Sequence, residues 1–128
     1  MKRGILFGLV LAGMTVIAFQ RLGAASAVAM EIHHGRLVTS QGQSSKEIAK
    51  RHALDWARLR YGAKNVRLIA ASDKTGYCAI AVAGRNGGGV LVGVSLANRS
   101  QAEADALAID HCRQAGGAEP KVIRRWQG

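Results

Sequence analysis

The chain has 128 residues, and its 18 Lys and Arg residues exceed its 8 Asp and Glu residues to give a formal net charge of +10. This length leaves room for one small domain with a core of limited size. No set of residues in the sequence requires one particular chemistry, so the pattern alone identifies no activity.

The N-terminal segment has the layout of a secretory signal peptide. A basic head (residues 1–3) precedes an uncharged run of sixteen residues (4–19), and a tail of small residues (24–29) follows. This order predicts a cleaved signal, and the mature chain is then expected to begin near Val28 or Met30.

The uncharged run is shorter than the roughly 20 residues that a membrane-spanning helix needs. Residues 1–29 are therefore interpreted as a signal peptide, with an uncleaved membrane anchor as the alternative. We expect the protein to be exported to the periplasm or the exterior, with no stable membrane anchor after cleavage. Its remaining basic excess then indicates an acidic protein or another anionic envelope component as partner, and simple solubility is the alternative explanation.

The next segment, residues 30–43, shows no clear hydrophobic period and is expected to form an irregular arm, or a short edge strand over residues 36–39. His33 and His34 lie in this arm. No third ligand is near them in the sequence, so no metal site is predicted.

The first helix is predicted over residues 44–61. Ser44 and Glu47 have the spacing of a capping box. One face is expected to be apolar and comprises Ile48, Ala49, His52, Ala53, Trp56 and Leu59. His52 and Asp55 are three residues apart, as a base and its orienting carboxylate would be, but no other member of a catalytic set accompanies them. A partly buried core histidine is therefore the preferred interpretation.

Three strands, a second helix and a last strand follow. Period-2 alternation predicts strands over residues 65–72, 77–83 and 90–95, with a hairpin turn at Asn86-Gly87. A capping box at Ser100 opens a helix over residues 101–115, whose buried stripe is expected to comprise Ala104, Leu107, Ala108 and Cys112. The chain closes with a short strand over residues 121–126. The glycine-rich turn leads into a strand and not a helix, so it is no phosphate loop.

The order α-β-β-β-α-β predicts an α+β domain over residues 44–128. We expect a small antiparallel sheet of three to four strands with both helices on one face. A helix, a glycine and a strand occur in that order twice, but this weak echo does not establish a duplication.

A disulfide between Cys78 and Cys112 is expected on geometric grounds. Cys78 lies on the bulky face of its strand with Ile80 and Val82, and that face is expected to meet the second helix. Because Cys112 lies on the buried stripe of that helix, an exported protein would join the two thiols. Two separate buried thiols are the alternative.

The stretch from Tyr77 to Val122 resembles a family of small exported bacterial domains, the domain-of-unknown-function family numbered four-one-eight-nine. The resemblance is carried by Tyr77-x-Ala-Ile-Ala-Val, a glycine-rich turn, Gly-Val-Ser at residues 93–95, and the spacing of Ser100, Glu103 and Cys112. Members usually have glycine where this chain has Cys78, and two further cysteines that it lacks. The resemblance implies export and a compact α+β domain, and it implies no activity.

The preferred hypothesis is an exported, basic, non-enzymatic domain that acts without a cofactor as a binding or inhibitor-like module. Its expected partner surface comprises Lys50, Arg51, Arg58, Arg124 and Arg125. An envelope hydrolase with a site around His52 is one alternative. A double-stranded-RNA-binding module is a second, but it needs a lysine cluster at the start of its second helix, where this chain has Gln101, Ala102 and Glu103. Nucleic acid is therefore not an expected partner.

Overall fold

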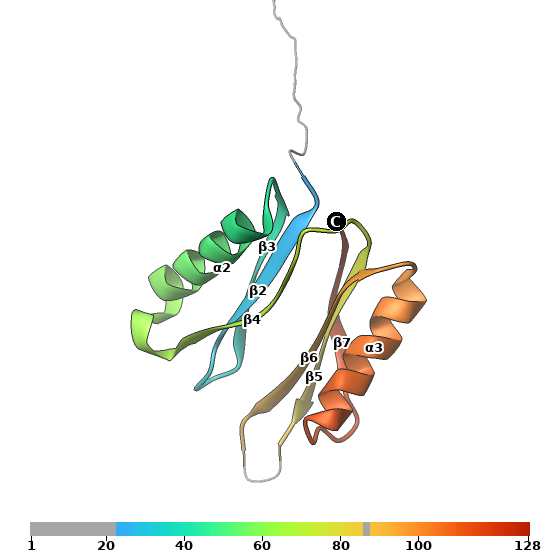
Figure 1. The fold of residues 1–128 in the computed structure, drawn as a ribbon. Helices are drawn as coiled ribbons and strands as arrows, with labels where there is room; N and C mark the ends of the chain where they lie inside the picture. The colour runs from blue at the N-terminus through green and yellow to red at the C-terminus, as the bar shows by residue number, and fades with distance from the viewer. Residues whose placement is uncertain (1–22, 86–87) are drawn as a thin grey trace, which may run out of the picture.

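The computed structural model describes residues 23–85 and 88–128 (Figure 1). The described chain forms two units with the same order, strand, strand, helix and strand. The first unit comprises β2 (Ala25–Glu31), β3 (Arg36–Gln43), α2 (Lys46–Tyr61), the short 3-10 helix η2 (Ala63–Asn65) and β4 (Val66–Ser72). The second comprises β5 (Tyr77–Gly84), β6 (Val90–Asn98), α3 (Gln101–Gln114) and β7 (Lys121–Gln127). The hairpin turn predicted at Asn86-Gly87 lies outside the described residues.

Each unit builds a three-stranded antiparallel sheet with its first strand in the centre. The strand orders are β3-β2-β4 and β6-β5-β7. α2 packs on the first sheet and α3 on the second, while the opposite faces of the two sheets pack on each other. The helices therefore lie on the two outer sides of the molecule, as Figure 1 shows.

Small side chains determine which face of each sheet meets its helix. In the first unit the alternating alanines of β2 pack against alanines four residues apart on α2: Ala25, Ala27 and Ala29 against Ala49, Ala53 and Ala57. The second unit repeats this pattern with Ala79, Ala81 and Ala83 against Ala104, Ala108 and Cys112. Because these side chains are short, each helix lies close to its sheet.

The bulky faces of the strands form the core between the two sheets. Its fully or nearly buried members are Val28, Cys78, Ile80 and Trp126. Branched side chains of β3, β4, β5 and β6 pack around them. Across this layer the indole Nε1 of Trp126 donates a hydrogen bond to Ser26 Oγ at 3.2 Å.

The expected single sheet with both helices on one face is wrong. The α+β class and the order from α2 onward agree with expectation, but β2 and β3 precede α2 and the sheets are two. The expectation assumed that the bulky strand faces meet the helices. In the structure two such faces meet each other in the apolar core between the sheets, and the alanine faces meet the helices.

The structure does not show the irregular arm expected over residues 30–43, and the alternative, an edge strand from residue 36, agrees with it although the strand is longer. This segment contributes the end of β2, a turn and all of β3. Residues 25–29, assigned from the sequence to the end of the signal peptide, form most of β2, the central and almost wholly buried strand of its sheet. Alternating small residues are typical both of a signal cleavage site and of a strand that packs under a helix. The sequence pattern therefore does not distinguish the two interpretations.

The register shifts in the strand pairings occur at equivalent positions in the two units. In each unit the first strand has one irregularity toward its second strand and another toward its third. These irregularities lie at Ala25/Ala27 and Val28/Ala29 in the first unit, and at Tyr77/Ala79 and Ile80/Ala81 in the second. This match makes Val38, paired with Ala29, the equivalent of Gly93, paired with Ala81.

The helices begin in the same way in both units. Ser45 and Ser100 are the N-caps, and their hydroxyls accept hydrogen bonds from the backbone N–H groups of Ile48 and Glu103, both at 3.1 Å. The first cap is thus Ser45, one residue later than the Ser44 expected from the sequence. Among the described residues, no helix has the length and apolar character needed to cross a membrane.

Candidate binding groove

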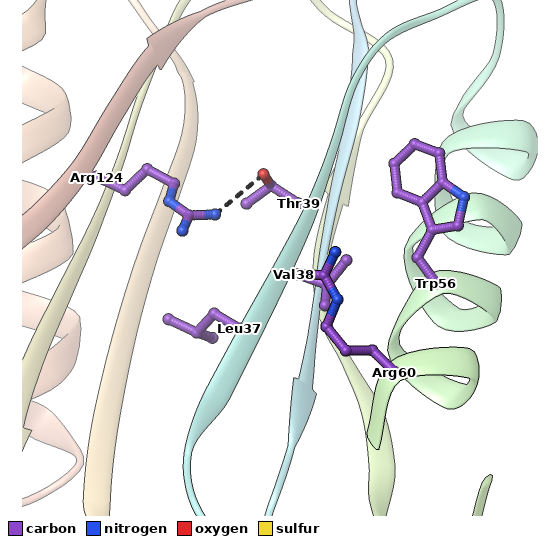
Figure 2. Close-up of a pocket in the computed structure, with 6 residues that line it drawn as sticks. All are labelled: Leu37, Val38, Thr39, Trp56, Arg60 and Arg124. Atoms are coloured by element: carbon purple, nitrogen blue, oxygen red, sulfur yellow. Dashed lines mark hydrogen bonds between the residues drawn. The ribbon is translucent and has the colours of Figure 1, made fainter. Parts of the chain in front are cut away.

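A groove with a volume of about 290 Å³ runs along the free edge of β3. Figure 2 shows its lining, which comprises Leu37, Val38, Thr39, Trp56, Arg60 and Arg124. The first three residues come from β3, the next two from α2 and the last from β7. The groove therefore joins the two units.

The edge position of β3 divides the groove into two sides. Val38 packs into the layer below α2, whereas Leu37 packs into the core between the sheets. Trp56 and Arg60, one helical turn apart on α2, lie on the Val38 side, and Arg124 lies on the Leu37 side (Figure 2). Between these sides an edge strand presents the N–H and C=O groups of every second residue to solvent.

The groove is lined by two cations and no carboxylate. Arg124 donates a hydrogen bond from Nη1 to Thr39 Oγ1 at 3.3 Å. Within residues 23–85 and 88–128, neither Arg60 nor Arg124 makes an ion pair. Arg36 adds a third cation at the start of β3, where its guanidinium carbon lies 5.3 Å from the centre of the Tyr61 ring.

Trp56 supplies an exposed aromatic surface at the groove. It is 47% exposed, although the sequence placed it on the buried face of its helix. Alanines at every fourth position narrow the buried stripe of α2, so Leu59, 88% exposed, also lies outside it. The i, i+4 spacing of Trp56 and Arg60 is visible in the sequence, but only the position of the stripe shows that the pair is accessible.

His52 packs against this tryptophan. The two rings stack with centroids 5.5 Å apart and an interplanar angle of 26°. His52 Nδ1 is buried and has no hydrogen-bond partner in the described part of the chain. Asp55 instead lies 3.7 Å from Arg58 Nη1. The structure therefore does not bring together the base and carboxylate that the sequence spacing suggested.

The five basic residues expected to form a partner surface differ in their surroundings. Three of them make ion pairs: Lys50 with Glu47, Arg58 with Asp55, and Arg125 with Asp105. Arg51 is exposed on α2. Arg124 is the member that lines the groove, and no sequence pattern indicates that it lies beside Trp56 and Arg60.

The expected disulfide is not formed, since Cys78 and Cys112 are both free and buried. Cys78 lies in the core between the sheets, whereas Cys112 lies in the layer between α3 and its sheet. The sheet of the second unit separates the two thiols, because Cys78 shares a face with Ile80 and not with the alanines that meet α3. Burial raises the pKa of both thiols, so both are poor nucleophiles at neutral pH.

The two adjacent histidines stabilise the turn between β2 and β3. The buried Glu31 carboxylate accepts the backbone N–H groups of His33 and His34, each at 3.0 Å, and lies 3.2 Å from His34 Nδ1. Burial raises the pKa of Glu31, but these hydrogen bonds outweigh it and hold the pKa below its ordinary value of 4.5. Within the described ranges, no three His, Cys, Asp or Glu side chains gather as metal ligands would.

In the second unit a side chain bonds the equivalent edge strand. His111 Nδ1 lies 2.9 Å from the Val94 carbonyl oxygen of β6, so the ring donates a hydrogen bond to this edge strand. His111 is the eleventh residue after its N-cap, as Trp56 is after Ser45. The tryptophan and the histidine therefore occupy equivalent positions beside equivalent strands.

No family model, curated protein or solved structure matches the chain at a significant level. The resemblance between Tyr77 and Val122 to exported bacterial domains of unknown function stays a prediction. The function must be inferred from the groove itself.

Proposed function

We propose that the protein is a non-enzymatic binding module whose groove beside β3 binds an anionic partner. The observation that carries this proposal is the lining itself, in which Arg60 and Arg124 border one volume and no carboxylate lines it. Guanidinium groups present several N–H donors in a fixed plane and pair with carboxylates or phosphates. The exposed face of Trp56 adds apolar contact area.

The chemistry of the lining favours binding over catalysis. It contains no histidine, cysteine, aspartate or glutamate that could act as a general base or nucleophile. Its one hydroxyl, on Thr39, accepts a hydrogen bond from Arg124. The ring of His52, the centre of the hydrolase alternative, stacks on Trp56.

The N-terminal pattern supports an envelope or extracellular location for this binding. The basic head and the uncharged run precede the described fold and are typical of an exported chain. An acidic protein or another anionic envelope component is the partner that the basic excess of the remaining chain would attract.

Charge reversal in the groove tests the proposal. The probe is a fluorescein-labelled peptide, acetyl-Thr-Val-Glu-Glu-Val-Thr-amide with the dye on a flexible linker, and the control is the same peptide with Lys-Lys in place of Glu-Glu. The double variant R60E/R124E should bind the acidic probe at least about tenfold more weakly than the unmodified protein, a change of about 1.4 kcal/mol. The lysine peptide should not bind the unmodified protein.

The matched control variant is R67E/R113E, which makes the same charge change at two exposed arginines on β4 and α3. It should retain binding within a factor of about three, since exposed charges are screened beyond roughly 8–10 Å at physiological salt. Equal loss in the two double variants would show attraction to net charge alone and would overturn the groove as the site.

A further inference from the structure

We infer that the partner contributes an extended acidic peptide that joins the free edge of β3 as an additional strand. This inference rests on the proposed function and specifies how the anionic partner is held. It places backbone hydrogen bonds along β3 and acidic side chains against Arg60 and Arg124, on the two sides of the added strand.

The first support is the open edge. β3 has eight residues and lies at the end of its sheet, so its outward N–H and C=O groups have no strand beside them in the described structure. Proteins usually cover or interrupt such an edge, because it can pair with another chain. In the second unit His111 bonds the Val94 carbonyl of the equivalent strand. Trp56 stands in the place of that histidine, and the groove lies where the bond would be.

The second support is the position of the two arginines. Successive side chains of an added strand point to opposite faces of the sheet. One face would meet Trp56 and Arg60 on α2, and the other would meet Leu37 and Arg124. Each face thus offers one cation and one apolar surface. Two consecutive acidic residues flanked by apolar ones match this arrangement, since each carboxylate then finds its own arginine.

Charge argues against the other two occupants of the edge. A second copy of the chain would bring another net charge of +10 and would place Arg36 and Arg60 of both copies along one seam. Residues 1–22 of the chain itself contain no Asp or Glu. Neither offers carboxylates to the groove, and an acidic partner peptide does.

Hydrogen exchange of the β3 amides tests the inference on the full chain. With the unlabelled acidic peptide at saturation, NMR should show exchange slowed at least about tenfold at alternate residues between Leu37 and Gln41. The residues between them already pair with β2 and should change little. The Trp56 fluorescence should shift at the same time, measured in a W126F background.

Backbone methylation of the peptide provides the matched control. Two versions carry N-methyl groups at odd or at even positions and have identical charge. Only one of the two methylated peptides should bind more weakly, by at least about tenfold, because an added strand directs alternate N–H groups toward β3. Equal binding by both versions would overturn strand addition.

The remaining outcomes separate this inference from the function on which it rests. A Trp56 shift with unchanged β3 exchange would show groove binding without an added strand, and would overturn the inference alone. No binding of the acidic peptide would overturn both. Concentration-dependent protection of β3 without peptide, with dimers in sedimentation, would assign the edge to a second copy. Equal displacement of the peptide by millimolar glutamate or inorganic phosphate would reduce the site to a small-anion site.

Discussion

The two units share one fold and differ at one edge. At Gly93 an added Cβ would lie only 2.5 Å from the Cys112 backbone nitrogen, so α3 packs directly on the backbone of β6. At the equivalent position the first unit has Val38, a buried side chain over which α2 must pass. From its close position α3 lets His111 reach the edge of its sheet, whereas beside α2 a groove is open.

This difference shows that one fold can carry an edge strand bonded by a helix side chain and an edge strand that borders a groove. Among the residues that differ at this place are Val38, where the second unit has Gly93, and Trp56, where the second unit has His111. The alanine layers under the helices and the serine N-caps are repeated in both units. A binding site built in this way leaves the shared core unchanged, and the following experiments test that separation.

Deleting the central strand of one unit should have the largest effect. A chain lacking residues 1–29 loses most of β2, which lies between β3 and β4, and should show no cooperative unfolding by circular dichroism. A chain lacking only residues 1–22 keeps every residue of that strand and should unfold cooperatively. A cooperative transition in the shorter chain would show that the second unit folds without the first. It would also remove the structural objection to a mature chain beginning at Met30.

The two tryptophans should separate stability from binding. W126A removes a nearly buried side chain from the core between the sheets and its bond to Ser26, and should destabilise the protein by about 3–5 kcal/mol in urea unfolding. W56A removes a half-exposed side chain and should cost less than about 1 kcal/mol, yet weaken binding of the acidic peptide. A large loss of stability in W56A would show that Trp56 contributes to the core and would contradict its role as a groove residue.

Filling the close contact below α3 should destabilise the second unit selectively. G93V inserts a branched side chain against the α3 backbone and should cost about 3 kcal/mol in the free energy of unfolding. The matched control is G84V, at a glycine of the same sheet whose added Cβ would meet nothing within 4 Å. It should change stability by less than about 0.5 kcal/mol. Similar values for the two variants would show that α3 can move away from β6.

Removing the side chain that bonds the β6 edge should lower the free energy of unfolding only slightly. H111A loses one hydrogen bond to the Val94 carbonyl, worth about 0.5–1.5 kcal/mol. It should also speed amide exchange along β6, without affecting β3. If β6 exchange stays unchanged, another group protects this edge, and the contrast between the two edges loses its basis.

The turn of the first unit should carry a small, pH-dependent contribution. The lowered pKa of Glu31 means that the folded protein favours the ionised form, so this stabilisation is complete above the ordinary value of 4.5. It disappears as the pH falls through the lowered pKa of the folded state. E31Q should therefore be less stable than the unmodified protein at pH 7, and the difference should close in acid. A constant difference from pH 7 to pH 3 would contradict the role of the charge.

The sequence predicted elements better than layers. Both helices and the strands from residue 65 onward agree with the structure within a few residues, because their period and caps are local signals. No local signal determines which face of a strand packs against the helix and which against the other sheet. The predicted disulfide would have to cross a sheet, because Cys78 and Cys112 lie on its opposite faces. The small residues of β2 fit a cleavage motif as well as a strand. The groove could not be predicted, because it depends on Arg124 of the second unit reaching Thr39 of the first.

The hydrogen bond between Trp126 and Ser26 also constrains when the protein can fold. The two residues are 100 positions apart in the chain, and one belongs to the first described strand and the other to the last. During synthesis, the face of β2 that carries Ser26 can be buried only after β7 has been made. Until then an apolar strand face is exposed, so we expect the emerging chain to depend on chaperones or on rapid release.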